Sequence, residues 1–227
     1  MRDRLFVGLA LIAASCKVKD PPPITAPWTD SFDRTDLGPN YYVTGEGYRV
    51  ASAGSGGSAG SGGSAASGGN GALSAKGAHN HPLWLRAKLP RNVRIEFDCW
   101  STEPRGDLKV EVFGDGRSFD PDGGRYTATG YEVIFGGWYN TKSEIARLDE
   151  HGTDLAARTD VKVVPNQHYH WKIERSGKTI KWFVDDMTKP FLAYDDPAPL
   201  EGPGHEYVAI NNWETDTWFD NLVVAPL

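Results

Sequence analysis

The sequence predicts an all-β domain, an antiparallel sandwich or barrel, on three observations. Short runs rich in β-branched and aromatic residues recur along most of the chain, with Gly, Pro, Asn and Asp between them. Several runs alternate apolar and charged side chains, as strands with one buried face do. No convincing amphipathic helix is found, and the only brief helical candidate is Asp154 to Arg158. Many short strands with regular turn signals indicate a sandwich or a barrel.

The first sixteen residues predict a processing signal rather than a part of the fold. Arg2 and Arg4 form a short charged region, and Leu5 to Ala14 form an apolar region too short to span a bilayer. A small-residue cleavage site follows and ends in Cys16. This order is typical of a bacterial lipoprotein signal peptide over residues 1–15, with Cys16 lipidated. It predicts a lipid-anchored protein of the bacterial cell envelope, facing the periplasm or the exterior; an ordinary signal peptide is the alternative.

A proline-rich tether over residues 16–27 precedes one predicted domain, residues 28–227. The formal net charge of -6 and the lack of a basic block argue against nucleic acid as the partner. If Cys16 carries lipid, Cys99 has no disulfide partner, and its place on the apolar side of a predicted strand indicates a small buried residue. The sequence also lacks the serine-esterase elbow, the phosphate-binding loop and the dinucleotide fingerprint, which excludes those common enzyme classes.

Residues 51–71 form a low-complexity segment inside the predicted domain. Apart from Asn70 they are all Gly, Ser or Ala, a composition that predicts disorder. About twenty domain residues precede the segment, fewer than the ~40 that fold unaided, so a surface loop is favoured over an interdomain linker. Tyr48 to Val50 and Ala72 to Ser74 are then expected to be adjacent in one sheet.

The remaining predicted strands follow one another with turn residues between them. Ser176 to Lys178 predicts a tight turn, so the runs on either side form a hairpin with Trp171 and Trp182 on its inward face. The strand runs are, in chain order, Leu83 to Leu85, Val93 to Trp100, Leu108 to Phe113, Tyr131 to Phe135, Ile145 to Leu148, Tyr169 to Glu174, Thr179 to Val184, Tyr207 to Asn211 and Trp218 to Val224.

The stretch from Tyr126 to Asn140 is predicted to be a central strand that ends in an aromatic, glycine-hinged loop. Because successive strand side chains point to opposite sides of a sheet, Tyr131 and Val133 share one face and Glu132 lies on the other. A carboxylate is thereby placed mid-strand among apolar neighbours. Glu132 is therefore the favoured candidate for a functional acid.

Three passages resemble one family: Thr129 to Val133, the hairpin Glu174 to Asp186, and Trp218 to Val224. They are similar to the concanavalin A-like jelly roll, specifically the 3-keto-disaccharide hydrolase family, formerly a domain of unknown function. The resemblance implies a two-sheet jelly-roll sandwich and glycoside hydrolase activity. The family usually continues Gly-Tyr-Glu-Val with Gln and soon an Asp, whereas this chain continues with Ile134 to Trp138. The resemblance therefore supports the jelly-roll fold more strongly than it supports hydrolase activity.

Carboxylates on the predicted strands supply candidates for acid and base catalysis. Along Arg94 to Trp100, Glu96 and Asp98 share the face opposite the core, Glu111 continues that face on the next strand, and Glu132 adds a further carboxylate. Glycosidases need two carboxyl groups about 5 to 9.5 Å apart. Residues two apart on a strand are about 6.5 Å apart, so Glu96 and Asp98 meet that requirement. A solvated or salt-bridged sheet face is the alternative.

Aromatic residues supply candidates for glycan contact, since the chain has eight Trp and nine Tyr. Sugar rings expose apolar C–H faces, so carbohydrate sites combine flat aromatic rings with nearby amide and carboxylate groups. Ordinary packing at the rim of a sandwich is the alternative. The predicted glycan-binding residues are Trp100, Trp138, Tyr139, Asn140, Asn212 and Trp213.

Relatives of this fold often bind calcium between their terminal strands, which makes Asp30 and Asp220 candidates for a structural calcium site. No cofactor is otherwise required. The sequence thus predicts an envelope-anchored lipoprotein whose β-sandwich recognises a polysaccharide or oligosaccharide. A glycoside hydrolase of the 3-keto-disaccharide hydrolase kind and a structural or adhesion module are the alternatives.

Overall fold

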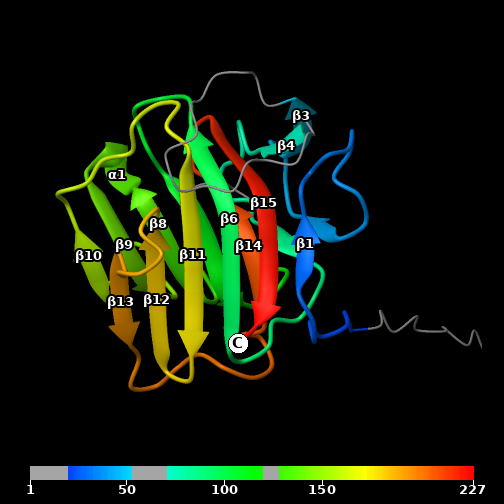
Figure 1. Ribbon diagram of the computed structural model, residues 1–227, viewed down its shortest axis with the longest axis vertical. Helices are drawn as coiled ribbons and strands as arrows, with labels where there is room; N and C mark the ends of the chain where they lie inside the picture. Colours follow the sequence, from blue (N-terminus) through cyan, green and yellow to red (C-terminus); the bar gives the residue numbers. More distant parts are fainter. Residues whose placement is uncertain (1–19, 53–70, 120–127) are drawn as a thin grey trace, which may run out of the picture.

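The computed structural model describes residues 20–52, 71–119 and 128–227, and it shows two antiparallel sheets packed as a sandwich (Figure 1). We call them the front and rear sheets after their places in that view. The predicted all-β sandwich is confirmed. Across the described residues the front sheet runs β13 (Leu192–Asp195), β12 (Thr179–Val184), β11 (Tyr169–Ser176), β6 (Val93–Ser101), β15 (Thr217–Pro226), β4 (Gly71–Ser74) and β3 (Arg49–Ser52), with β1 (Trp28–Asp30) paired to β15.

The rear sheet lies behind these strands in Figure 1. No helix in the described parts of the chain is long and apolar enough to cross a membrane. The helical element found there is the short turn α1 (Gly137–Asn140). The rear sheet runs β10 (Ala156–Arg158), β9 (Lys142–Arg147), β8 (Tyr131–Gly136), β7 (Leu108–Gly114), β14 (Tyr207–Asn211), β5 (Leu83–Leu85) and β2 (Tyr41–Val43).

The hydrophobic core fills the space between the two sheets. Trp171 on β11 and Trp182 on β12 are fully buried, with ring centres 4.6 Å apart. Their strands form the predicted hairpin, because Ser176 pairs directly with Thr179 across a two-residue turn. Cys99 is buried and free, as its place in the apolar pattern predicted. The front sheet therefore contributes a dense aromatic layer to the core.

Both faces of β7 and β8 are buried along their whole length. The face turned away from the core carries Lys109, Glu111 and Glu132, so the alternative of a solvated face does not hold for these two strands. The segment after β7 covers part of that face, because the Ser118 carbonyl accepts a hydrogen bond from the Trp84 indole at 3.0 Å. Charged groups are thereby enclosed on the outer side of the rear sheet.

The two flanks of the Gly/Ser/Ala segment pair with each other in the front sheet. Val50 on β3 lies opposite Leu73 on β4, and Ser52 lies opposite Gly71. This pairing agrees with a loop that leaves and re-enters one sheet. Residues 53–70 themselves lie outside the described residues, as do the predicted signal peptide, Cys16 and the first part of the tether, which fall within residues 1–19.

Asp154 to Arg158 does not form the helix that was predicted as a brief candidate. Its last three residues are the strand β10, in which Ala156 pairs with Ile145 and Arg158 pairs with Ser143 of β9. Three residues offer little intrinsic helical stability, so the hydrogen bonds gained at the sheet edge decide the conformation.

The C-terminal strand β15 contains a bulge at the segment that carries the family resemblance. Asp220 pairs with Asp98 and Val223 pairs with Glu96, so β15 has one extra residue between these pairs. Asn221 takes the left-handed conformation at φ 53°, which Asn tolerates better than most residues. The Asp-Asn pair is therefore suited to this local bend.

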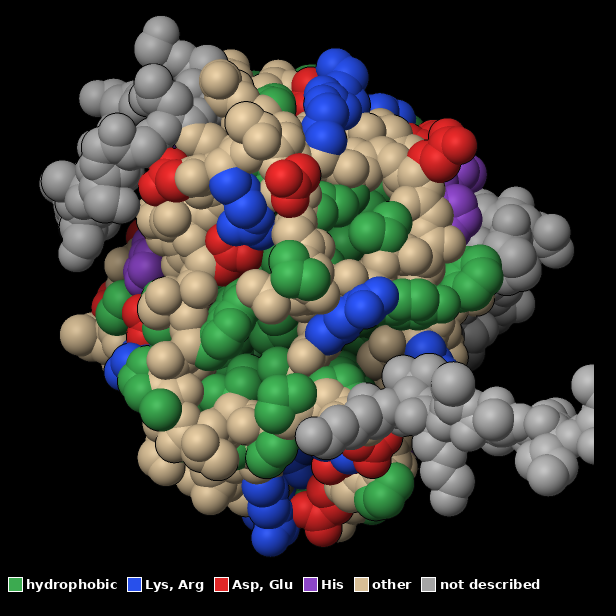
Figure 2. All heavy atoms as spheres, turned by 90° about the vertical axis from the view of Figure 1, so that its right-hand side faces the viewer, with side chains coloured by type: hydrophobic (Ala, Val, Ile, Leu, Met, Phe, Trp, Pro, Cys, Tyr) green, Lys and Arg blue, Asp and Glu red, His purple; other side chains and the backbone are tan. Residues whose placement is uncertain are grey.

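The N-terminal strands lie at one side of the sandwich, on the right in Figure 1. Figure 2 shows that side, where apolar side chains form patches separated by charged side chains and backbone. Tyr42 and Val43 on the edge strand β2 are 37% and 44% exposed, and the Arg86 guanidinium lies 5.8 Å from the Tyr42 ring centre. A basic side chain thus partly covers this edge, which hinders pairing with another strand.

Candidate functional site

The connection between β8 and β9 is a turn of unusual handedness. Trp138, Tyr139 and Asn140 all lie in the left-handed region, with φ 51°, 58° and 63°. This conformation costs roughly 1 to 2 kcal/mol for each residue with a side chain, so the surrounding structure must hold the turn. Such strain commonly marks a functional site.

The Asn140 side chain anchors this turn to two other segments. Its amide nitrogen donates to the Pro104 carbonyl at 3.0 Å and to the Val163 carbonyl at 2.8 Å, and its oxygen accepts from the Val163 N–H at 2.9 Å. Gly106 makes close approach possible from the other side, because a Cβ there would lie 2.3 Å from the Gly136 carbonyl oxygen. The turn is fixed in place despite its strain.

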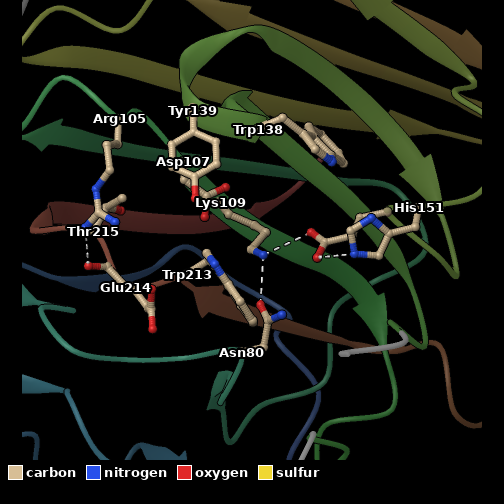
Figure 3. A pocket seen from close by; sticks show the side chains of 11 residues that line it. Asn80, Arg105, Asp107, Lys109, Trp138, Tyr139, His151, Trp213, Glu214 and Thr215 are labelled. Carbon is tan, nitrogen blue, oxygen red and sulfur yellow. Dashed lines mark hydrogen bonds and ion pairs between the residues drawn. The ribbon is translucent and has the colours of Figure 1, made fainter. Parts of the chain in front are cut away.

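A pocket of about 340 Å³ lies beside the turn. Trp138, Tyr139 and Trp213 stand around Lys109 and Asp107 (Figure 3), so aromatic rings face a polar floor. The rings come from α1 and from the segment after β14, and the floor comes from β7 and the turn before it. The remaining lining residues are Asn80, Arg105, Glu150, His151, Glu214 and Thr215.

Lys109 is the buried cation of the pocket floor. It is 1% exposed, and its Nζ donates to Asn80 Oδ1 at 2.8 Å and to Glu150 Oε2 at 3.0 Å. Burial acts to lower the pKa of Lys109, but the charges of Asp107 and Glu150 outweigh it and raise that pKa. The amine therefore stays protonated although water is excluded from it.

Glu132 lies close to Lys109 and Glu150 and is completely enclosed. It is 0% exposed, does not line the pocket, and neither carboxyl oxygen has a hydrogen-bond partner among the described residues. Burial, joined by the charges of Glu150 and Glu111, raises the pKa of Glu132 well above its usual range against the opposing effect of Lys109. The favoured acid of the sequence analysis is thus a protonated group that a ligand in the pocket does not reach.

Asp107 is the carboxylate that the pocket exposes in its place. It lines the pocket, takes the left-handed conformation at φ 65°, and donates its backbone N–H to the Gly136 carbonyl at 3.0 Å. Burial and the nearby charge of Glu150 raise the pKa of Asp107, and Lys109 opposes them. The raised pKa of Asp107 therefore reflects its burial first and the neighbouring carboxylate second.

The other predicted catalytic carboxylates do not join this site. Glu111 Oε1 accepts from the Thr129 and Gly130 N–H groups at 2.8 and 2.7 Å, so it holds the entry to β8. Glu96 and Asp98 lie on the outer face of the front sheet, on the far side of the sandwich. The prediction that β7 continues the face of β6 is wrong, because these consecutive strands belong to different sheets.

Glu96 and Asp98 have partners of their own on that far face. Glu96 pairs with Arg94 at 2.7 Å, while Asp98 contacts His170 Nδ1 at 2.7 Å and accepts from the Asn221 amide at 2.8 Å. These contacts agree with the salt-bridged sheet face that was the alternative for the pair.

The predicted glycan-binding residues divide into three groups. Trp138, Tyr139 and Trp213 line the pocket. Asn140 and Asn212 shape it without lining it: the Asn212 amide nitrogen donates to the Thr215 carbonyl at 2.7 Å and thereby folds the segment that carries Trp213. Trp100 lies in the front sheet, in a stack between His168 and Trp218. The structure does not bring Trp100 to the pocket.

Asp30 and Asp220 do not fit the predicted calcium site. Both carboxyl oxygens of Asp30 bind Arg34, and they also accept from the Tyr41 hydroxyl at 2.7 Å and the Phe32 N–H at 2.8 Å. Burial raises the pKa of Asp220 to about 6. Over the described residues no group of three or more His, Cys, Asp or Glu side chains is arranged to hold a metal ion.

Sequence reasoning missed most of the polar residues that line the pocket. Asn80, Asp107, Glu150 and Glu214 come from four connections that are far apart in the sequence, so strand periodicity gives no sign that they meet. One local signal was available, because the Gly106-Asp107 pair predicts a turn at the start of β7.

Comparison with known proteins supports the fold. A family model described as farnesoic acid O-methyl transferase matches residues 117–221, less than half of the chain. No curated protein matches. Among solved structures, a Bacillus subtilis protein of unknown function with a galectin-like fold has a TM-score of 0.56 at 11% identity. The match covers 89% of this chain and 97% of the Bacillus subtilis protein.

Two further solved structures have the same architecture. Domain 4 of AbnA, a GH43 extracellular arabinanase from Geobacillus stearothermophilus in complex with arabinotriose, has a TM-score of 0.55 at 14% identity, covering 90% of this chain and 92% of its own. The carbohydrate-binding module CBM66 from Bacillus subtilis has a TM-score of 0.52 at 12% identity, and the match covers 90% of this chain and 98% of the module. At these identities the likeness shows a shared fold.

Proposed function

We propose that this protein is a carbohydrate-recognition module that binds a saccharide in the pocket between Trp138, Tyr139 and Trp213. One observation carries the proposal: three aromatic rings surround a floor of carboxylate, amide and ammonium groups. Rings of this kind pack on the apolar C–H faces of a sugar, while the polar groups pair with its hydroxyls. The volume of about 340 Å³ is in the range of small-molecule sites.

The solved structures support the proposal at the level of architecture. Two of them are described as a carbohydrate-binding module and as an arabinanase domain in complex with arabinotriose. Another, described as a putative glycosyl hydrolase from Parabacteroides distasonis, has a TM-score of 0.55 at 13% identity. The sandwich is therefore one on which saccharide sites occur.

Binding is favoured over hydrolysis by the burial of Glu132. A catalytic acid must reach the glycosidic oxygen, and Glu132 is 0% exposed with Lys109 and Glu150 beside it. A hydrolase of the 3-keto-disaccharide hydrolase kind would have to draw its acid and base from Asp107, Glu150 and Glu214, the carboxylates that line the pocket. Turnover that survives Glu132→Gln and is lost in Asp107→Asn would support that alternative. An adhesion module would bind protein partners through the same pocket.

We further propose that the protein is a lipoprotein of the bacterial cell envelope. The charged, apolar and small-residue regions before Cys16 support this location. Within the predicted tether, Ile24 is buried in the core and donates its N–H to the Lys88 carbonyl at 2.9 Å, so this part of the tether belongs to the domain and is not a spacer. Cys16→Ser should abolish labelling by radioactive palmitate, and Cys99→Ala should leave the label in place. Equal labelling of the Cys16→Ser variant and the wild type would count against the anchor.

Saccharide binding is tested by a glycan array followed by calorimetry on the strongest ligand. Trp213→Ala removes one wall of the pocket and should weaken binding by about five- to thirtyfold, since a stacked aromatic ring contributes about 1 to 2 kcal/mol. Trp28→Ala is the matched control, because Trp28 pairs with the far end of β15 and does not line the pocket. Absence of binding to every saccharide, or equal loss in both variants, would refute the proposal.

A further inference from the structure

The pocket holds more negative than positive groups. Asp107, Glu150 and Glu214 line it together with two cations, Arg105 and Lys109. Whether the pocket prefers a cationic or an anionic ligand therefore depends on which of these groups already have protein partners.

Both cations are occupied by protein partners. Lys109 Nζ donates to Asn80 at 2.8 Å and to Glu150 at 3.0 Å. Arg105 Nε donates to Glu103 Oε2 at 2.8 Å, and its Nη2 donates to the Glu214 carbonyl at 2.9 Å. An acidic sugar would have to compete with these partners for both cations, and weakening a pair would leave a carboxylate with less compensation where water is excluded.

The surroundings of Lys109 already stabilise an ammonium group. Lys109 is fully buried and yet stays protonated, because the Asp107 and Glu150 carboxylates lie near it. The floor of the pocket is therefore made of groups that stabilise a positive charge.

The aromatic walls favour a cation as well. An ammonium group near the face of a tryptophan ring is attracted by about 0.5 to 2 kcal/mol. Trp138 already makes such a contact, with Lys142 Nζ 4.0 Å from its ring centre. Lys142 does not line the pocket, so that contact leaves Trp138 able to form the pocket wall.

We infer that the pocket prefers saccharides that carry a free, protonated amine over their neutral, N-acetylated or acidic counterparts. The inference rests on the proposed function and names the class of sugar. Asp107 is the specificity-determining residue, because it is the carboxylate that lies between the aromatic walls and the paired Lys109. The amine would lie beside Asp107, and the apolar face of the sugar would pack on Trp213 or Trp138.

Calorimetry on the full chain with four tetrasaccharides of one β-1,4 linkage tests the inference. The four probes are tetramers of glucosamine, N-acetylglucosamine, glucose and mannuronic acid. At pH 6 the glucosamine tetramer should bind about tenfold more tightly than the glucose tetramer, and the mannuronate tetramer should bind most weakly. Asp107→Asn should bring the glucosamine to glucose affinity ratio toward one, whereas Glu174→Gln, on the front sheet, should keep it.

The outcomes separate the inference from the proposed function. Equal or weaker affinity for the glucosamine tetramer overturns the inference while saccharide binding stands. The same holds if none of the four tetramers binds but the array finds another saccharide. No binding to any saccharide overturns both. An unchanged affinity ratio in Asp107→Asn, with a wild-type melting temperature, overturns the role of Asp107.

Discussion

At the scale of single residues, Glu132 shows how the surroundings of a buried carboxyl group keep it protonated and neutral. Its position opposite Glu111 and near Glu150 brings three acidic groups close together, and Lys109 is the cation that opposes their effect on Glu132. Burial makes a second full negative charge at this place unfavourable. The protein therefore keeps Glu132 protonated, and the stability of the fold depends on pH.

Glu132→Gln should stabilise the protein at pH 8 and have little effect at pH 4. The folded pKa of Glu132 lies above its unfolded value, so its contribution is fully present below the unfolded pKa and is lost as the pH rises toward the folded pKa. Glutamine does not titrate and should recover about 1 to 3 kcal/mol of unfolding free energy at pH 8. Urea unfolding at both pH values measures this difference.

Glu111→Gln is the matched control on the neighbouring strand. The Glu111 carboxylate accepts hydrogen bonds from the Thr129 and Gly130 N–H groups, so the same substitution should destabilise the fold at pH 8 by about 1 to 3 kcal/mol. Equal signs for the two variants would contradict the protonated state of Glu132.

At the scale of elements, the α1 turn links backbone strain to the shape of the pocket. Three consecutive left-handed residues present Trp138 and Tyr139 to the pocket, and Asn140 holds the turn against Pro104 and Val163. Left-handed residues are unfavourable unless something fixes them. Asn140 thus acts on binding as a positioning residue, through its neighbours in the turn.

Asn140→Ala should lower the unfolding free energy by about 1 to 3 kcal/mol and weaken saccharide binding, because it removes three hydrogen bonds and the tolerance of Asn for positive φ. Asn140→Gly removes the same bonds but accepts the backbone conformation. The glycine variant should therefore be the more stable of the two by about 1 kcal/mol in urea unfolding. Equal stability would show that backbone strain at this position has no cost.

Elements also mark where sequence reasoning succeeded and where it failed. Alternation along β6 and β8 correctly separated Phe97 and Val133, which face the core, from Asp98 and Glu132, which do not. Alternation carries no information on which sheet a strand joins. Asp98 and Glu132 therefore appeared to share a face, although the two sheets place them on opposite sides of the sandwich.

At the scale of the whole molecule, the sandwich could be predicted because its strands are short, apolar on one face and punctuated by turns. The pocket could not be predicted, because Asn80, Asp107, Glu150 and Trp213 lie in connections that are far apart in the sequence and approach one another only when the strands of the rear sheet are paired. The aromatic residues Trp138 and Tyr139 were found because they are adjacent in sequence. A site assembled from distant connections depends on topology, which local patterns do not encode.

Replacement of residues 53–70 by Asn-Gly tests the idea that the chain forms one domain. Ser52 pairs directly with Gly71, so a two-residue connection can close the β3–β4 hairpin without moving either strand. Closing a shorter loop costs less entropy, and the deletion should raise the unfolding free energy by about 1 to 2 kcal/mol. Saccharide affinity should stay unchanged, because β3 and β4 supply no residue to the pocket. Loss of cooperative unfolding would show instead that residues 53–70 contribute to the packed core.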